Sequence, residues 1–124
     1  MSSDCPFCSL NPQQVLGESD LALFFEDKFP VTPGHTLIIP RRHIVSYFEA
    51  TAAEKQSLWD MVDTVQRRLE VAYSPQGYNI GVNVGEAAGQ TVMHLHIHII
   101  PRYKGDMRDP RGGVRHVIPE KGKY

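Results

Sequence analysis

The most regular pattern in the sequence is an alternation of aliphatic residues with three histidines, His94, His96 and His98. A strict two-residue period is typical of a β-strand, because successive strand side chains point to opposite faces of the sheet. We therefore expect the three imidazoles to share one face and the aliphatic residues to face a core. Pro101 lacks an amide donor, so we expect ladder pairing to stop there.

Other periodic stretches predict further strands and one long helix. Thr51 and Glu54 form a capping box, and apolar residues then recur at helical spacing as far as Tyr73, where Ser74-Pro75 ends the pattern. Three apolar or alternating stretches bounded by turn residues predict strands over 21–25, 35–40 and 78–84. The first two of these are expected to be antiparallel neighbours.

Composition limits the class of protein and the kind of partner. A chain of 124 residues is expected to form one domain, and its net charge of -1 gives no electrostatic footprint for DNA or an anionic membrane. No apolar run approaches the roughly 20 residues that a membrane span needs, and no signal peptide pattern is present. We expect a cytoplasmic protein with a small-molecule partner.

Two kinds of metal site are compatible with the residues. A strand rises about 3.3 Å per residue, so the Cα atoms of His94 and His98 should lie about 13 Å apart, too far to share one zinc ion easily. Neighbouring triad histidines could still hold a metal. Cys5 and Cys8 form a Cys-x-x-Cys pair without the preceding strand of a redox motif, so they are either half of a tetrahedral zinc site, with His43 and His94 available to complete it, or two free thiols.

Residues 103–124 form a basic tail in which six lysines and arginines accompany three acidic residues. Glycines and prolines make regular structure improbable, except that 114–118 could form an edge strand. Such tails are commonly solvated surfaces. Because this tail follows directly after the histidine strand, the alternative to a solvated surface is that its basic residues bind a phosphate-bearing ligand.

Several blocks of the sequence together resemble the histidine triad (HIT) superfamily of nucleotide-binding proteins. The resemblance runs from Cys5 to Arg102 and rests on the histidine strand, Asp27, Pro33-Gly34-His35, Asn83, Gly89-Gln90-Thr91-Val92 and Pro101-Arg102. It implies an α+β fold, with an antiparallel sheet of about five strands and one long helix packed on it, in a single domain that usually forms a homodimer. It also implies adenine nucleotides as ligands.

The resemblance assigns a role to each matched residue. His96 would be the nucleophile that attacks the α-phosphorus and forms a covalent nucleotidyl-histidine, which water then resolves. His98 would hydrogen-bond an oxygen of the phosphate or leaving group, and His35 would orient the triad from behind. The remaining substrate contacts would come from Asp27 at the ribose and from Asn83, Gly89, Gln90 and Thr91 at the phosphate.

In a subset of the superfamily, an N-terminal Cys-x-x-Cys joins two histidines around structural zinc. Cys5, Cys8, His43 and His94 match this pattern, so zinc would staple the segment 1–14 to the histidine strand. The intact third histidine argues against the galactose-1-phosphate uridylyltransferase branch, and no zinc-finger extension of the aprataxin type is present.

The resemblance leaves several activities open. A dinucleoside polyphosphate hydrolase of bacterial type is favoured, because arginines of the tail could hold extra phosphates. An adenosine 5′-phosphoramidase and a polyphosphate phosphorylase are the alternatives within the superfamily. From other classes, we keep a non-catalytic nucleotide-binding module and a zinc hydrolase that uses His94 and His96 as ligands of a catalytic metal.

Overall fold

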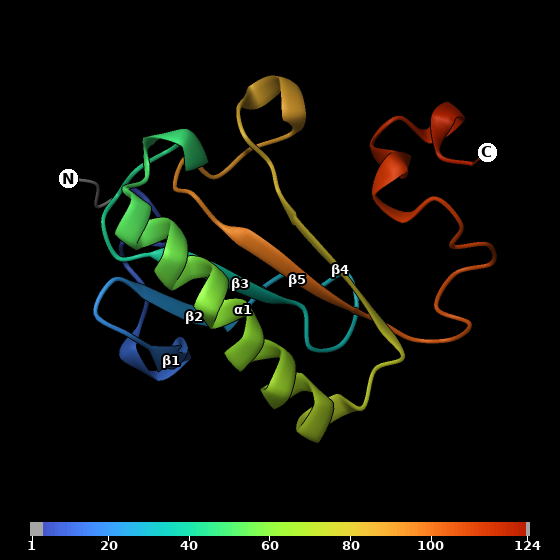
Figure 1. Cartoon of the computed structure of the whole chain (residues 1–124), viewed down its shortest axis with the longest axis horizontal. Coiled ribbons are helices and arrows are strands. Elements are labelled where there is room, and N and C mark those ends of the chain that lie inside the picture. The colour runs from blue at the N-terminus through green and yellow to red at the C-terminus, as the bar shows by residue number, and fades with distance from the viewer. Residues whose placement is uncertain (1–3, 124) are drawn as a thin grey trace.

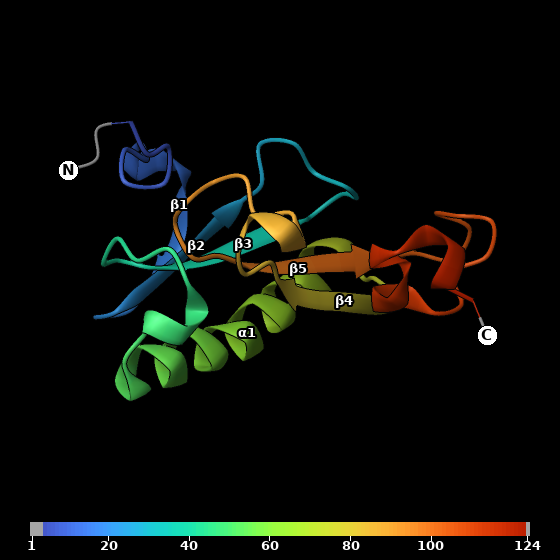
Figure 2. The same cartoon turned by 90° about the horizontal axis from the view of Figure 1, so that it is seen from above.

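The computed structural model describes residues 4–123; Met1, Ser2 and Ser3 of the predicted zinc-stapled segment and Tyr124 of the tail lie outside these residues. A five-stranded antiparallel sheet in the order β1-β2-β3-β5-β4 carries one long helix on one face (Figures 1 and 2). The strands are β1 (Val15–Glu18), β2 (Ala22–Glu26), β3 (Thr36–Pro40), β4 (Gly77–Val82) and β5 (Ile97–Arg102), and the helix is α1 (Ala52–Tyr73). The predicted α+β fold is confirmed.

Short 3₁₀ helices complete the secondary structure of the described chain. They span Pro12–Gln14, Tyr47–Glu49, Glu86–Ala88, Gly113–Val117 and Pro119–Lys121. The predicted edge strand over 114–118 is therefore wrong. The strand predicted over 21–25 corresponds to β2, and β1, which pairs with it in a hairpin, was not predicted. Among the described residues, no helix combines the length and the apolar character that crossing a membrane requires.

The histidine strand is shorter than predicted and begins only at Ile97. Before that residue, the amide of Leu95 donates to the carbonyl of Ile44, outside the ladder. The expectation that pairing stops at Pro101 is also wrong, because Pro101 pairs with Tyr78. On the side facing β3, Pro101 lies beyond the last ladder pair, Thr36 with Ile99, and its carbonyl accepts from Thr32 Oγ1 in the loop before β3. The missing N–H therefore faces no ladder partner.

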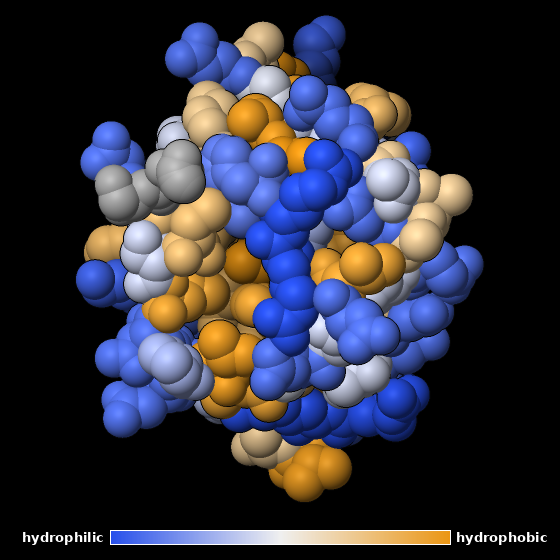
Figure 3. Space-filling view, turned by 90° about the vertical axis from the view of Figure 1, so that its left-hand side faces the viewer, coloured by the Kyte–Doolittle hydropathy of each residue, from blue (hydrophilic) through white to orange (hydrophobic). Residues whose placement is uncertain are grey.

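The core lies between α1 and the sheet. Leu58, Val65 and Leu69 of α1 are fully buried and pack with aliphatic residues of β3 and β5. On the opposite face, a smaller cluster of Phe25, Leu37 and Ile39 is covered by apolar side chains of the N-terminal segment. Figure 3, which views the left-hand side of Figure 1, shows separate hydrophobic patches among hydrophilic residues. The sheet thus has one face packed by the helix, while its other face carries this smaller cluster and the cavity described below.

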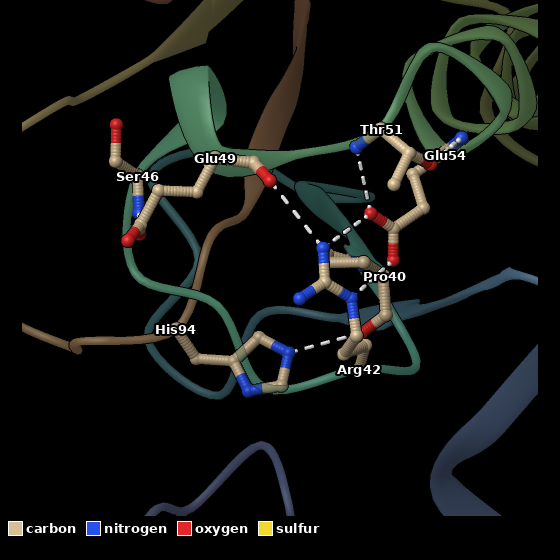
Figure 4. A network of polar contacts seen from close by, with 7 residues as sticks. All are labelled: Pro40, Arg42, Ser46, Glu49, Thr51, Glu54 and His94. Atoms are coloured by element: carbon tan, nitrogen blue, oxygen red, sulfur yellow. Dashed lines mark hydrogen bonds and ion pairs between the residues drawn. The ribbon is translucent and has the colours of Figure 1, made fainter.

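The first turn of α1 is fixed by the predicted capping box and by an arginine. Thr51 Oγ1 accepts from the amide of Glu54 at 3.0 Å, and the buried Glu54 carboxylate accepts from the amide of Thr51 at 2.9 Å. Arg42 donates to both oxygens of Glu54 at 2.8 and 3.0 Å, and also to the carbonyl of Glu49 (Figure 4). The helix is thereby tied to the loop that follows β3.

We expect Glu54→Gln to lower the free energy of unfolding at pH 7 by about 1–2 kcal/mol, because a charged pair becomes a weaker neutral contact and Arg42 is partly solvated. Arg42 lowers the pKa of Glu54 from 4.5 to about 2. A depressed carboxyl pKa stabilises the fold above the unfolded value, and this contribution is lost as the pH falls from 4.5 towards 2.

Urea titrations at several pH values measure this difference. Glu49→Gln is the comparison variant, since the Glu49 carboxylate caps a short exposed turn and acts on Arg42 through its charge without a hydrogen bond to it. An effect of Glu54→Gln that is equal at pH 7 and pH 3 would contradict the assigned charge pairing.

Candidate functional site

His96 and His98 lie on the face of the sheet that α1 does not cover, because the aliphatic residues between and beyond them fill the core. Their ring centroids are 5.0 Å apart. His35, just before β3, has its ring centroid 5.2 Å from that of His98, and Asp27 follows β2 with a carboxylate oxygen 3.5 Å from His35 Nε2. The structure therefore brings these four predicted side chains together.

A relay of hydrogen bonds fixes the tautomers of two of these histidines. The amide of Val31 donates to His35 Nδ1 at 3.0 Å, so the ring proton of neutral His35 must sit on Nε2. His35 Nε2 lies 3.0 Å from His98 Nδ1 and donates to it. The proton of neutral His98 is thereby placed on Nε2, where it can be donated to a ligand.

Both imidazoles of the relay are kept neutral by their surroundings. Burial lowers the pKa of His35, and this effect outweighs the opposing attraction of Asp27. Burial also lowers the pKa of His98 to about 4, with further lowering by the neighbouring His96 and His35. At neutral pH, His98 is therefore a neutral hydrogen-bond donor.

His96 has the complementary arrangement. Its Nδ1 lies 2.8 Å from the carbonyl oxygen of His94, an acceptor only, so in the neutral ring the proton sits on Nδ1 and Nε2 keeps its lone pair. His96 as a whole residue is 9% exposed, and Phe7 packs edge-on against its ring with centroids 5.1 Å apart. Held from two sides, His96 presents an unprotonated nitrogen in a fixed orientation, as a nucleophile requires.

A cavity of about 530 Å³ opens onto these groups. Six of the predicted catalytic and substrate-binding residues line it: Asp27, Asn83, Gly89, Thr91, His96 and His98. Asp27 also accepts from the amide of Phe29 through Oδ1, which orders the loop at the rim. The polar part of the cavity therefore gathers a carboxylate, an amide, a hydroxyl and two imidazoles around one space.

Gln90 does not line this cavity. It is 2% exposed, its Oε1 accepts from the amide of Gly85, and its Nε2 donates to the carbonyls of Val45 and Val92. The Gln90 side chain therefore folds the loop before β5, and the Gln90 amide donates to the carbonyl of Gly85 at 3.1 Å. A phosphate contact from this residue stays a prediction.

The sequence interpretation missed the apolar part of the cavity. Its walls include the side chains of Phe7, Leu10, Phe25 and Leu37. Phe7 also contacts Phe25 edge-on, with centroids 5.2 Å apart. The alternation of β2 and β3 could have identified the strand residues as a second apolar face, but the packing of Phe7 requires the N-terminal segment to fold back over the sheet.

The predicted zinc ligands meet beside the nucleophile. Ligand atoms of Cys5, Cys8, His43 and His94 all lie within 4.8 Å of one another. His94 Nδ1 is 3.6 Å from each sulfur, and His43 Nδ1 is 3.1 Å from His94 Nδ1 and 3.2 Å from Cys8 Sγ. His94 Nε2 donates to the carbonyl of Pro40 at 3.0 Å (Figure 4), which leaves Nδ1 available to a metal. Two sulfurs and two imidazole nitrogens at these separations fit tetrahedral Zn²⁺.

The arrangement does not favour a catalytic metal held by His94 and His96. Within residues 4–123, neither group of clustered ligand atoms contains His96. The second group, Asp27, His35 and His98, is already joined by the relay described above.

Comparison with known proteins identifies the family. The family model described as HIT domain matches residues 9–105. The chain is 40% identical over 96 residues to the asymmetrical bis(5′-nucleosyl)-tetraphosphatase of Schizosaccharomyces pombe, covering 77% of this chain and 53% of that protein. It is 34% identical over 129 residues to the bifunctional bis(5′-adenosyl)-triphosphatase/adenylylsulfatase of Arabidopsis thaliana, covering 99% of this chain and 71% of that protein.

Solved structures agree in fold. A zinc-bound histidine triad family protein from Mycobacterium smegmatis superposes with a TM-score of 0.77 at 33% identity, covering 89% of this chain and 86% of that chain. The description of that protein as zinc-bound agrees with the chemistry of the Cys5, Cys8, His43 and His94 cluster.

Proposed function

The chain belongs to the HIT domain family, and from this premise we propose that it is a nucleotidyl hydrolase or transferase that acts at the α-phosphorus of adenosine nucleotides such as diadenosine polyphosphates. The observation that carries the proposal is that two neighbouring histidines have opposite tautomers. His96 Nε2 has a free lone pair, whereas His98 Nε2 carries a proton that it can donate in a hydrogen bond. One group attacks and the other supports departure.

The reaction then has two steps. His96 Nε2 attacks the α-phosphorus, a nitrogen–phosphorus bond forms, and the bond to the leaving-group oxygen breaks while His98 Nε2–H donates to that oxygen. The positive charge on the phosphorylated His96 ring is stabilised by its Nδ1–H bond to the carbonyl of His94. The leaving polyphosphate departs as an anion that accepts a hydrogen bond from His98 Nε2–H, and His98 keeps its proton. Water next attacks the phosphorus, the nitrogen–phosphorus bond breaks with its electron pair returning to His96 Nε2, the water proton passes to solvent, and the nucleoside monophosphate leaves.

The cavity supports a nucleoside as the transferred group. The apolar side chains of Phe7, Phe25 and Leu37 suit a base, and the Asp27 carboxylate in the same cavity suits the ribose hydroxyls. Asn83, Thr91 and the backbone at Gly89 remain for the phosphate oxygens. The two enzyme relatives named above are described by different activities, so the family alone does not fix the leaving group. Polyphosphate hydrolysis, phosphoramidate hydrolysis and phosphorolysis are therefore three forms of the same proposal.

Zinc belongs to the proposal as a structural cofactor. Cys5, Cys8, His43 and His94 would hold it, and it would stabilise the N-terminal segment on the sheet without taking part in bond cleavage. Assembly as a homodimer and a cytoplasmic location remain predictions.

Product analysis by chromatography tests the function. The protein should convert diadenosine tetraphosphate into a mononucleotide and the complementary nucleotide, faster than it releases ammonia from an adenosine phosphoramidate. Phosphate in place of water as acceptor separates a phosphorylase from a hydrolase. Turnover of the phosphoramidate alone would move the protein to the phosphoramidase alternative, and turnover of neither would favour a binding module.

A further inference from the structure

A second cavity of about 400 Å³ lies along the same face of the sheet as the histidines. Its walls include Val31, Thr32, Asn79, Ile100, Met107 and His116. Ile100 follows His98 by two residues on β5, which places it about 7 Å further along the same face. None of the predicted substrate-binding residues lines this cavity.

Three elements run from the first cavity to the second. On β5, His98 lines the first and Ile100 the second; in the loop after β2, Phe29 lines the first and Val31 the second. The third element is β4 with the residues that follow it, where Asn83 lines the first cavity and Asn79 the second. The two cavities are therefore neighbours.

At Gly81, between the two cavities, no side chain projects from the sheet. Gly81 pairs with His98 across the ladder, and Asn79 pairs with Ile100. A Cβ added at Gly81 would meet no atom within 4 Å, so the sheet face is open beside His98. A chain of phosphates leaving the α-phosphorus past His98 has room to continue towards Ile100.

The tail covers the second cavity as a folded segment. Asp106 accepts from Arg102 at the end of β5, and Asp109 pairs with Arg111 and Lys123. Gly112 has a φ of 96° and lies so close to Gly122 that a Cβ would not fit. The turn Gly113–Val117 then lies against β4 (Figure 2). A cover held by these contacts is organised before a ligand arrives, which reduces the entropic cost of binding.

We propose that this second cavity binds the leaving nucleoside of a dinucleoside polyphosphate. The inference rests on the proposed function and adds the subsite that distinguishes a dinucleotide from a mononucleotide. Ile100, Val31 and Met107 supply apolar surface for a base. The side-chain oxygen of Asn79 accepts from Arg102, so the side-chain NH₂ group of Asn79 is oriented to donate hydrogen bonds to the ligand. The tail has six basic and three acidic residues, a charge balance that favours a polyphosphate.

Binding measurements with two matched ligands test the subsite. Adenosine 5′-tetraphosphate and diadenosine tetraphosphate share the phosphate chain and differ by the second nucleoside. Calorimetry on the His96→Ala protein, which does not consume the ligand, should show diadenosine tetraphosphate binding about tenfold more tightly or better, as burial of a base predicts.

Substitutions in two separate elements should remove this preference. Ile100→Ala on β5 and Met107→Ala on the tail should each reduce the ratio of the two affinities by about threefold or more, with the affinity for adenosine 5′-tetraphosphate unchanged. Ile80→Ala is the matched control, because Ile80 belongs to the neighbouring strand and does not line the cavity. Met107 is 46% exposed, so its substitution tests the subsite even if Ile100→Ala impairs folding.

Equal affinities for the two ligands in the parent protein, or a preference that survives both substitutions, would overturn the subsite. These outcomes are separate from failure of the proposed function. A wild-type protein that turns over neither diadenosine tetraphosphate nor the phosphoramidate would refute the function, whereas the binding ratio reports on the second nucleoside without any turnover.

Discussion

His96→Ala should reduce kcat/KM for an adenosine nucleotide by at least about 10³-fold, because loss of a nucleophile removes the covalent route. The thermal midpoint should change little, since the ring lies at the cavity and the core is formed by the aliphatic residues of β5. Rapid quenching of the wild type, followed by mass spectrometry of peptides, should find one adenylyl group on His96. The variant should carry none.

His98→Asn provides the contrasting measurement. If the hydrogen bond from His98 Nε2–H stabilises the leaving anion, the loss of rate should be large for a basic leaving group and smaller for an acidic phenol, whose anion needs little stabilisation. His96→Ala should abolish turnover of both substrates equally. An adenylyl group found on another residue, or substantial activity without His96, would contradict the proposed nucleophile.

Much of this fold follows from local patterns in the sequence. The capping box at Thr51 and Glu54 and the stop at Ser74 predict the helix correctly, because both signals involve neighbours in the chain. The residues alone leave a zinc cluster and two free thiols open for Cys5 and Cys8, and the family resemblance selects the cluster with His43 and His94, whose ligand atoms the structure brings together.

Features that depend on distant contacts could not be predicted in this way. The alternation of the triad predicts one strand, yet His94 lies before the start of β5 at Ile97. The His94 ring is hydrogen-bonded to the carbonyl of Pro40, a residue 54 positions away in the sequence. Gln90 reads as a ligand-binding residue, whereas its side chain is used by three backbone groups. The tail reads as solvated, and the contact between Gly112 and Gly122 that folds it involves no periodic pattern.

Removal of zinc should destabilise the protein more than any single substitution outside the metal cluster. Metal analysis should find one zinc per chain, and a strong chelator should lower the thermal midpoint by about 10 °C or more, because a bound structural metal contributes directly to folding. Cys5 is buried, and without zinc nothing would bind its sulfur to His43 and His94, so the N-terminal segment would be held less firmly on the sheet. His43→Ala should reproduce the loss, and Arg41→Ala, two residues away and outside the metal cluster, serves as its control. An unchanged midpoint after the zinc is removed would contradict a structural role.

The same measurement bears on the nucleotide site, because Phe7 lies between the two cysteine ligands and packs on both His94 and His96. Ordering of the Cys5–Cys8 turn by zinc fixes Phe7 at the apolar wall of the cavity, so zinc and adenosine monophosphate should each tighten binding of the other by the same factor. Zinc affinity measured by chelator competition, with and without adenosine monophosphate, gives that factor. Phe7→Ala should abolish the coupling while the four metal ligands remain, and coupling that persists in Phe7→Ala would assign it to His94 and His96 alone.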